Sequence, residues 1–199
     1  MSTRFTRLAG LLGVLAPIFT LTLIFVSVAL SPWFDWHNNA LSDIGVSRTP
    51  NPFNAALLIG GVMYFAFSIG FLRWQGTRST LNKIAAFFML AGGAGLLLVG
   101  IFTEDAGRIH YVVAVTYFLA TPLAYVLFGV GMLKCGERVP GALSIAAGLA
   151  ALAMILFVPH RRYAVPEILA AVVISAWTLS FGVKMLFERW KATEAHADA

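Results

Sequence analysis

Six stretches of this chain contain no Asp, Glu, Lys, Arg or His, and five of them are at least 20 residues long. A stretch of about 20 apolar residues is what a helix needs to cross a hydrocarbon core of about 30 Å. In the shorter last stretch, Lys184 can extend its charged end towards the interface, which lets a helix continue to about residue 187. The stretches cover residues 8–34, 49–72, 84–103, 111–133, 139–159 and 168–183.

These stretches predict that the chain crosses a membrane six times. Hydrophobic residues make up 59% of the sequence and charged residues only 12%, against about 25% charged in soluble domains. Spanning helices satisfy their own backbone hydrogen bonds, so no strand is needed. We therefore predict an all-α, polytopic membrane protein with one domain over residues 1–188 and a polar tail over residues 189–199. The expected six helices lie near residues 8–30, 54–73, 84–103, 109–133, 141–158 and 166–188.

The basic residues predict the orientation of these helices. Ten of the 14 lysine and arginine residues lie near the two termini and in the loops after the second and fourth helices. Because cytoplasmic segments are enriched in basic residues, we expect both termini in the cytoplasm and the protein in the cell membrane. The net charge of +5 then reflects topology and contact with the lipid bilayer, and we expect no nucleic-acid partner.

The ionisable side chains gather on the predicted outer side. Five of the nine acidic residues and three of the four histidines lie there, and none is near the middle of a helix. Ion-coupled transporters usually hold an ionisable group near the middle of the membrane. The distribution therefore favours a site at the outer lipid–water boundary.

The first polar cluster follows the first helix. Asp35 is a plausible N-cap and Gly45 a plausible C-terminal stop, which predicts a short helix lying in the interface. We expect Asp35 and Asn38 only to cap turns of the loop. The predicted helix would place the side chains of Asn39, Ser42 and Asp43 on one face, where they are candidate binding or catalytic groups. The alternative is that these side chains also only cap turns and form hydrogen bonds within the loop.

The second cluster joins the third and fourth helices. Glu104 or Asp105 could cap the fourth helix, whose first turn contains His110. The helix dipole disfavours protonation of His110, and a neutral imidazole can act as a general base or bind a metal. An interfacial histidine hydrogen-bonded to a loop carbonyl is an equally good interpretation.

The third cluster lies between the fifth and sixth helices. Arg161 and Arg162 run against the positive-inside trend, which phosphate binding by Arg161 or simple solvation would explain. His160 could join His110 and a carboxylate at a metal site, but no short ligand spacing supports one, and we assign no metal ligand.

The loop Asn39-Ala-Leu-Ser-Asp-Ile-Gly45 resembles one in a widespread prokaryotic family of membrane proteins of unknown function. That family's pattern continues with a Phe-Asn pair, here Phe53-Asn54, a Gly-x-Phe-x-Glu stretch, here Gly100 to Glu104, and a histidine, here His110. Thr103 stands where the family often has proline. The resemblance implies a multi-pass membrane fold and supplies no reaction.

The Ser-Asp-x-Gly part of this loop is more remotely similar to eukaryotic autophagy-modulator and lipid-remodelling membrane proteins. A looser likeness is to the zinc-dependent alkaline ceramidases and adiponectin receptors. Those proteins have seven helices and a late His-x-x-x-His pair, whereas Ala164 follows His160 at that spacing here. This departure argues against zinc hydrolysis.

The sequence therefore favours a protein that binds a lipid head group or another amphiphile at the outer membrane face. In the enzyme version of this hypothesis the protein also hydrolyses or transfers part of the ligand, His110 is the general base, and Glu104 or Asp43 orients it. The expected binding residues are Asn39, Ser42, Asp105, His160 and Arg161. The alternatives are a small carrier or channel for a neutral or amphipathic solute, and a non-catalytic partner of another membrane protein.

Overall fold

The computed structural model describes residues 3–75, 80–157 and 164–187, and within these ranges the chain is helical, with no strand. This confirms the predicted all-α architecture. Two short 3-10 helices, η1 (Leu41–Val46) and η2 (Glu104–Ala106), lie between the long ones. The six long helices are α1 (Thr3–Ala29), α2 (Asn51–Gln75), α3 (Thr80–Ile101), α4 (Arg108–Lys134), α5 (Arg138–Phe157) and α6 (Ala164–Phe187).

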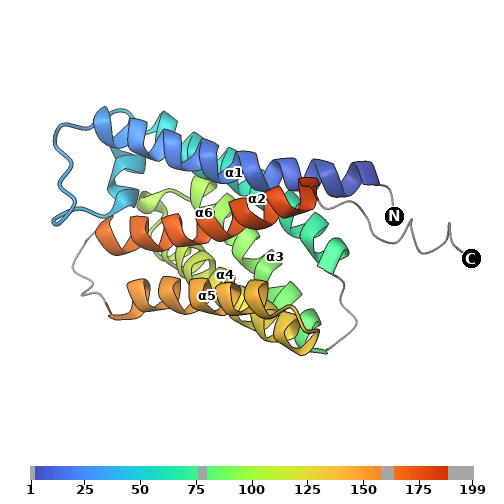
Figure 1. Cartoon of the computed structure of the whole chain (residues 1–199). Helices are drawn as coiled ribbons and strands as arrows, with labels where there is room; N and C mark the ends of the chain where they lie inside the picture. The colour runs from blue at the N-terminus through green and yellow to red at the C-terminus, as the bar shows by residue number, and fades with distance from the viewer. Residues whose placement is uncertain (1–2, 76–79, 158–163, 188–199) are drawn as a thin grey trace, which may run out of the picture.

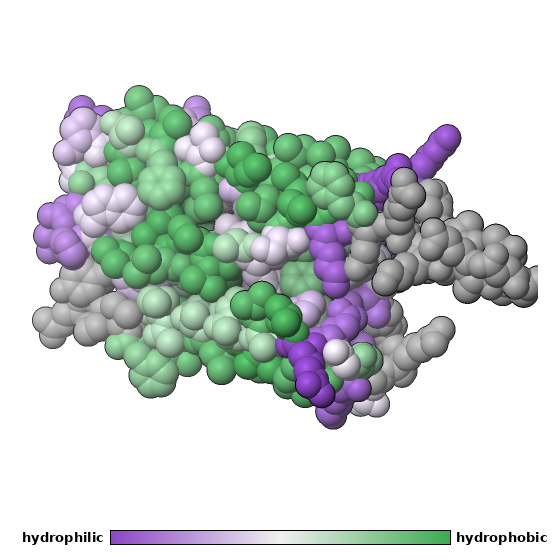
Figure 2. Space-filling view, viewed as in Figure 1, coloured by the Kyte–Doolittle hydropathy of each residue, from purple (hydrophilic) through white to green (hydrophobic). Residues whose placement is uncertain are grey.

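All six long helices are long and apolar enough to cross a membrane. Figure 2 shows the resulting apolar belt, with hydrophilic side chains at the two ends of the molecule. The helices begin up to five residues before their predicted starts; α1, for example, begins at Thr3 and includes Arg4 and Arg7. Charged side chains at a helix end can reach the interface, so they need not end the helix. The predicted tail lies outside the described residues.

The six helices form a closed ring. Each packs against its neighbours in sequence, and α6 also packs against α1. The first turn of α1 and the last turn of α6 lie at the same end of the bundle (Figure 1), as expected for six passes. The opposite end carries η1, η2, the loop before η1, and the first turns of α4 and α6; we call it the acidic end.

Glycines bring neighbouring helices into backbone contact. A methyl group added at Gly61 of α2 would lie 2.5 Å from the backbone nitrogen of Leu97 in α3. One added at Gly95 would lie 2.9 Å from the backbone of Tyr117 in α4. These distances are too short for a side chain, so the small residues permit the close approach of the helices.

Aromatic side chains fill the ring in the half away from the acidic end. The ring of Phe71 packs against five other aromatic rings at centroid distances of 5.1–5.8 Å. Next to this cluster the Tyr125 hydroxyl bonds to the Tyr64 hydroxyl at 3.1 Å and to that of Thr178 at 2.9 Å. Trp177 donates to Ser144 at 2.9 Å. Several hydroxyls that could have lined a solute path therefore join helices together.

Candidate functional site

The loop before η1 is a hydrogen-bonded turn and not the predicted interfacial helix. The Asp35 carboxylate accepts bonds from the His37 backbone at 2.7 Å and from the Asn38 side chain at 3.0 Å, and these bonds lower the pKa of Asp35. Ala40 is extended, with φ −85° and ψ 156°, so regular structure begins only at Leu41. The expected local capping by Asp35 and Asn38 is confirmed, and the helix starting at Asp35 is wrong.

Asn39 and Asp43 nevertheless meet. The Asp43 carboxylate accepts a bond from the Asn39 amide at 3.1 Å and another from the Ala40 backbone at 3.0 Å. The Asn39 carbonyl in turn accepts a bond from the backbone nitrogen of Ala164 at 2.7 Å. The turn thus brings Asp43 to a fixed position and ties it to the first residue of α6.

Gly45 and Asn54 fasten the other end of η1 to α2. The Asn54 amide donates to the Gly45 carbonyl at 2.9 Å. A methyl group added at Gly45 would lie 2.6 Å from the Asn54 side-chain oxygen and 3.2 Å from the Phe53 ring. A residue without a side chain is therefore needed at this crossing.

Glu167, in the first turn of α6, is the site residue that the sequence reasoning passed over. Its Oε2 accepts a hydrogen bond from the backbone nitrogen of Leu41 at 2.9 Å. This bond joins two segments that lie 126 residues apart. The sequence signal for Glu167 is an acidic residue at the start of an otherwise apolar helix. The helix dipole favours acidic residues in the first turn of any helix, so this position alone does not indicate a functional site.

Glu104 of η2 completes a group of three acids with Asp43 and Glu167, which we call the carboxylate group. Burial raises the pKa of Glu104 to about 7, the nearby Asp43 carboxylate and the charge of Glu167 add to the rise, and the Ser42 hydroxyl opposes it. Oε2 of Glu104 is buried and has no hydrogen-bond partner among the described residues. Near neutral pH this carboxyl can therefore both hold and release a proton.

His110 lies in the first turn of α4, as predicted. Its Nδ1 is 2.8 Å from the Phe102 carbonyl oxygen. A carbonyl can only accept, so in the neutral ring Nδ1 carries the proton and Nε2 keeps a free lone pair. The carbonyl holds the imidazole through Nδ1, and the role expected of Glu104 or Asp43 in orienting the ring stays a prediction. The predicted loop-carbonyl bond and a role as base are thus compatible.

The two acids of η2 do not cap α4. The cap position is Gly107, at φ +60°, and no side chain bonds to the first turn. Asp105 is exposed, and its carboxylate accepts a bond from the Thr103 hydroxyl. Of the two predicted acids, only Glu104 belongs to the carboxylate group.

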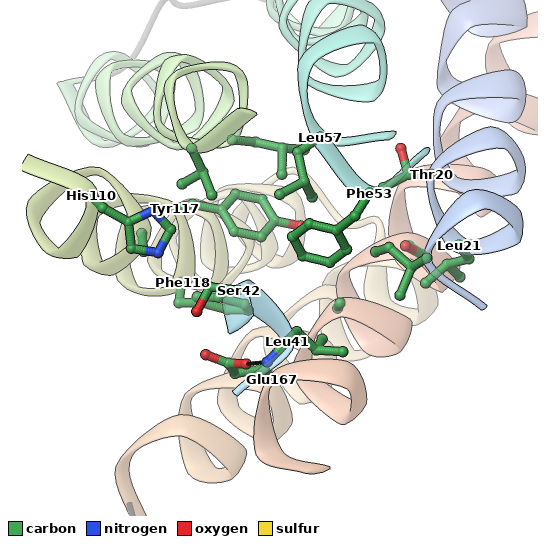
Figure 3. A pocket seen from close by; sticks show the side chains of 16 residues that line it. Thr20, Leu21, Leu41, Ser42, Phe53, Leu57, His110, Tyr117, Phe118 and Glu167 are labelled. Atoms are coloured by element: carbon green, nitrogen blue, oxygen red, sulfur yellow. Dashed lines mark hydrogen bonds between the residues drawn. The ribbon is translucent and has the colours of Figure 1, made fainter. Parts of the chain in front are cut away.

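A cavity of about 70 Å³ lies against this site. Most of its wall is apolar, as the phenyl ring of Phe53 in Figure 3 illustrates. In that view the side chains of His110, Ser42 and Glu167 lie towards one end of the pocket, and Leu21 lies at the other. The polar residues of the wall are Thr20, Ser42, His110, Tyr117, Glu167 and Ser175.

A larger, apolar groove of about 310 Å³ adjoins the cavity. It runs between α4, α5 and α6 and is lined by exposed residues such as Tyr111 and Leu156. Phe118, Ala114 and Glu167 line both hollows. A single layer of side chains therefore separates the polar cavity from the lipid-facing surface.

The last two predicted site residues belong to the segment between α5 and α6. His160 and Arg161 lie outside the described residues. Among the residues that the structure describes, no three His, Cys, Asp or Glu side chains are placed to hold a metal ion. The cavity is lined by residues of η1 and of every long helix except α5, and the carboxylate group comes from η1, η2 and α6.

Residues 14–184 match the model of a family described as "Protein of unknown function (DUF998)". The match covers most of the chain, so the protein belongs to this family. Similarity searches found no match among curated proteins and none among solved structures.

Proposed function

We propose that this membrane protein binds an amphiphile at its acidic end, with the polar head of the ligand in the cavity. One observation carries the proposal: Ser42, His110 and Glu167 come from three separate elements and gather polar groups towards one end of a mostly apolar cavity. Small-molecule sites commonly have this composition, with a few convergent polar groups in an apolar wall.

The adjoining groove suits the apolar tail of the same ligand. Its lining is almost wholly apolar, and its position between membrane-spanning helices exposes it to lipid. Because Phe118 and Ala114 line both hollows, a tail in the groove and a head in the cavity can belong to one molecule. Under the predicted orientation, that molecule comes from the outer leaflet.

Hydrolysis or transfer of part of the ligand is the catalytic form of this proposal. The free Nε2 of His110 is the atom that would take a proton from water or from a ligand hydroxyl. The carboxylate of Asp43 or Glu104 can hold a developing positive charge, and Ser42 and Asn39 can bind the ligand's polar atoms. Arg161, predicted from the sequence as a phosphate-binding residue, would take part only if the ligand carried a phosphate.

A cavity-filling variant tests ligand binding. Ala171 lines the cavity, so Ala171→Leu should exclude the ligand. Leu169→Phe is the matched control, because Leu169 is 42% exposed on the same helix and does not line the cavity. Both variants and the wild type are purified from native membranes, and bound amphiphiles are measured by native mass spectrometry. We expect an adduct on the wild type and the control that falls at least about fivefold in Ala171→Leu; equal adducts on all three would contradict the proposal.

A further inference from the structure

The polar wall of the cavity includes two hydrogen-bond acceptors, Nε2 of His110 and a carboxylate oxygen of Glu167, and Glu167 belongs to the carboxylate group. We propose that the ligand's head carries a protonated amine. This inference rests on the proposed function and names its ligand class. It follows from the arrangement of charge and of lone pairs around the cavity.

Among the described residues of the acidic end, acidic side chains outnumber basic ones. The described residues there include five acids but only two arginines, Arg48 and Arg108, both of which are exposed. The one salt bridge among the described residues joins Lys184 to Glu137, far from the acidic end. No described cation therefore neutralises Asp43, Glu104 or Glu167.

The acceptor atoms at the cavity also have lone pairs that a hydrogen-bond donor of the ligand can occupy. His110 uses Nδ1 on the Phe102 carbonyl, which leaves Nε2 as an acceptor. Glu167 uses Oε2 on Leu41, and its other oxygen has no described partner. An ammonium group has three donors and one positive charge, so it can bond to both acceptors and match the sign of the carboxylate charge.

Other head groups fit less well. A phosphate would bring negative charge next to three carboxyl groups, and like charges in a site of low dielectric repel strongly. A hydroxyl would donate one hydrogen bond and leave the buried charge without compensation. The amine satisfies both requirements.

The proposal has a pH signature. A primary amine stays protonated to about pH 10, whereas Glu104 gains a proton as the pH falls through about 7. Protonation of Glu104 removes a negative charge beside Asp43 of η1 and Glu167 of α6, and His110 of α4 is the other titratable group at the cavity. Amine binding should therefore be strong at pH 8 and about tenfold weaker at pH 5.5.

Three probes that share one alkyl chain and differ in their head group test this proposal. Radiolabelled tetradecylamine, tetradecanol and tetradecyl phosphate are titrated at pH 8 against the protein in phosphatidylcholine nanodiscs, with empty nanodiscs as the background. We expect saturable binding of the amine, at least about tenfold tighter than that of the other two. Glu167→Gln and Glu104→Gln should each weaken amine binding about tenfold, because Gln keeps the shape and an acceptor but removes the charge.

Asp35→Asn is the control, because Asp35 is exposed at the same end and lies outside the cavity wall and the carboxylate group; its amine affinity should stay within about twofold of the wild type. Tighter binding of tetradecanol or tetradecyl phosphate would overturn the amine and leave amphiphile binding standing. Unchanged amine affinity in both glutamine variants would also overturn it. Saturable binding of none of the three probes would remove the proposed function as well.

Discussion

At the scale of the residue, Glu104 is a partly buried carboxyl whose pKa rises to about 7 from an ordinary value of 4.5. Because the folded protein holds this proton more tightly than the unfolded chain, its stability falls as the pH rises from about 4.5 to 7. Glu104→Gln should therefore raise the free energy of unfolding at pH 8 by about 1–2 kcal/mol, allowing for solvent screening. At pH 4.5 it should change little.

Thermal unfolding in detergent at the two pH values measures this difference. Asp105→Asn serves as the control, since the same kind of substitution on an exposed acid should have an equally small effect at both. If Glu104→Gln raised the free energy of unfolding equally at both pH values, ionisation of Glu104 would not destabilise the folded protein.

His110 offers a second residue-scale prediction, for the catalytic form of the proposal. In His110→Asn, the side-chain amide can still donate to the Phe102 carbonyl, but the lone pair of Nε2 is gone. The free energy of unfolding should change by less than about 0.5 kcal/mol, whereas turnover of a reconstituted amphiphile should fall about 100-fold. Turnover equal to that of the wild type would remove His110 as the base.

At the scale of the element, the spacing between α2 and α3 depends on Gly61. A methyl group there would lie 2.5 Å from backbone atoms of Leu97, so the two helices would have to move apart. Gly61→Ala should lower the free energy of unfolding by about 1–3 kcal/mol. Val62→Ala, at the next residue and 50% exposed, should have little effect. Denaturant unfolding in mixed micelles compares the two variants.

The helices could be predicted from the sequence, whereas the loops could not. Lipid forces each uncharged stretch into a helix, so the stretches over residues 84–103 and 111–133 lead almost directly to α3 and α4. No comparable constraint acts outside the membrane. The pattern of Asn39, Ser42 and Asp43 suggested a helix face, but side-chain hydrogen bonds to the backbone hold a turn there instead.

The candidate site was predictable in its location and partly in its members. The segregation of charge indicated the acidic end, and Asp43, Glu104 and His110 lie there around one cavity or beside it. Glu167 escaped notice because its partner, the backbone of Leu41, is distant in sequence. Which carboxyls meet depends on how the ring closes, and a hydropathy pattern carries no information about that closure.

At the scale of the whole molecule, the single cysteine can report the orientation. Cys135 is exposed and follows α4, so it lies at the end opposite the acidic end. With both termini in the cytoplasm, a membrane-impermeant maleimide should label Cys135 in inverted vesicles but not in intact cells. In a Cys135→Ser background, Thr49→Cys at the acidic end should show the reverse pattern. Labelling of Cys135 in intact cells would place the acidic end inside.

The contact between α6 and η1 bears on how the protein is made. α6 is synthesised after the other five helices, yet it forms two hydrogen bonds with the segment that follows α1. Glu167 accepts one from the backbone nitrogen of Leu41, and the backbone nitrogen of Ala164 donates the other to the Asn39 carbonyl. A nascent chain that has inserted only five helices lacks both bonds and one wall of the pocket. The pocket is therefore complete only after the final insertion event, and a chain that terminates after α5 would be a membrane-embedded product without that pocket.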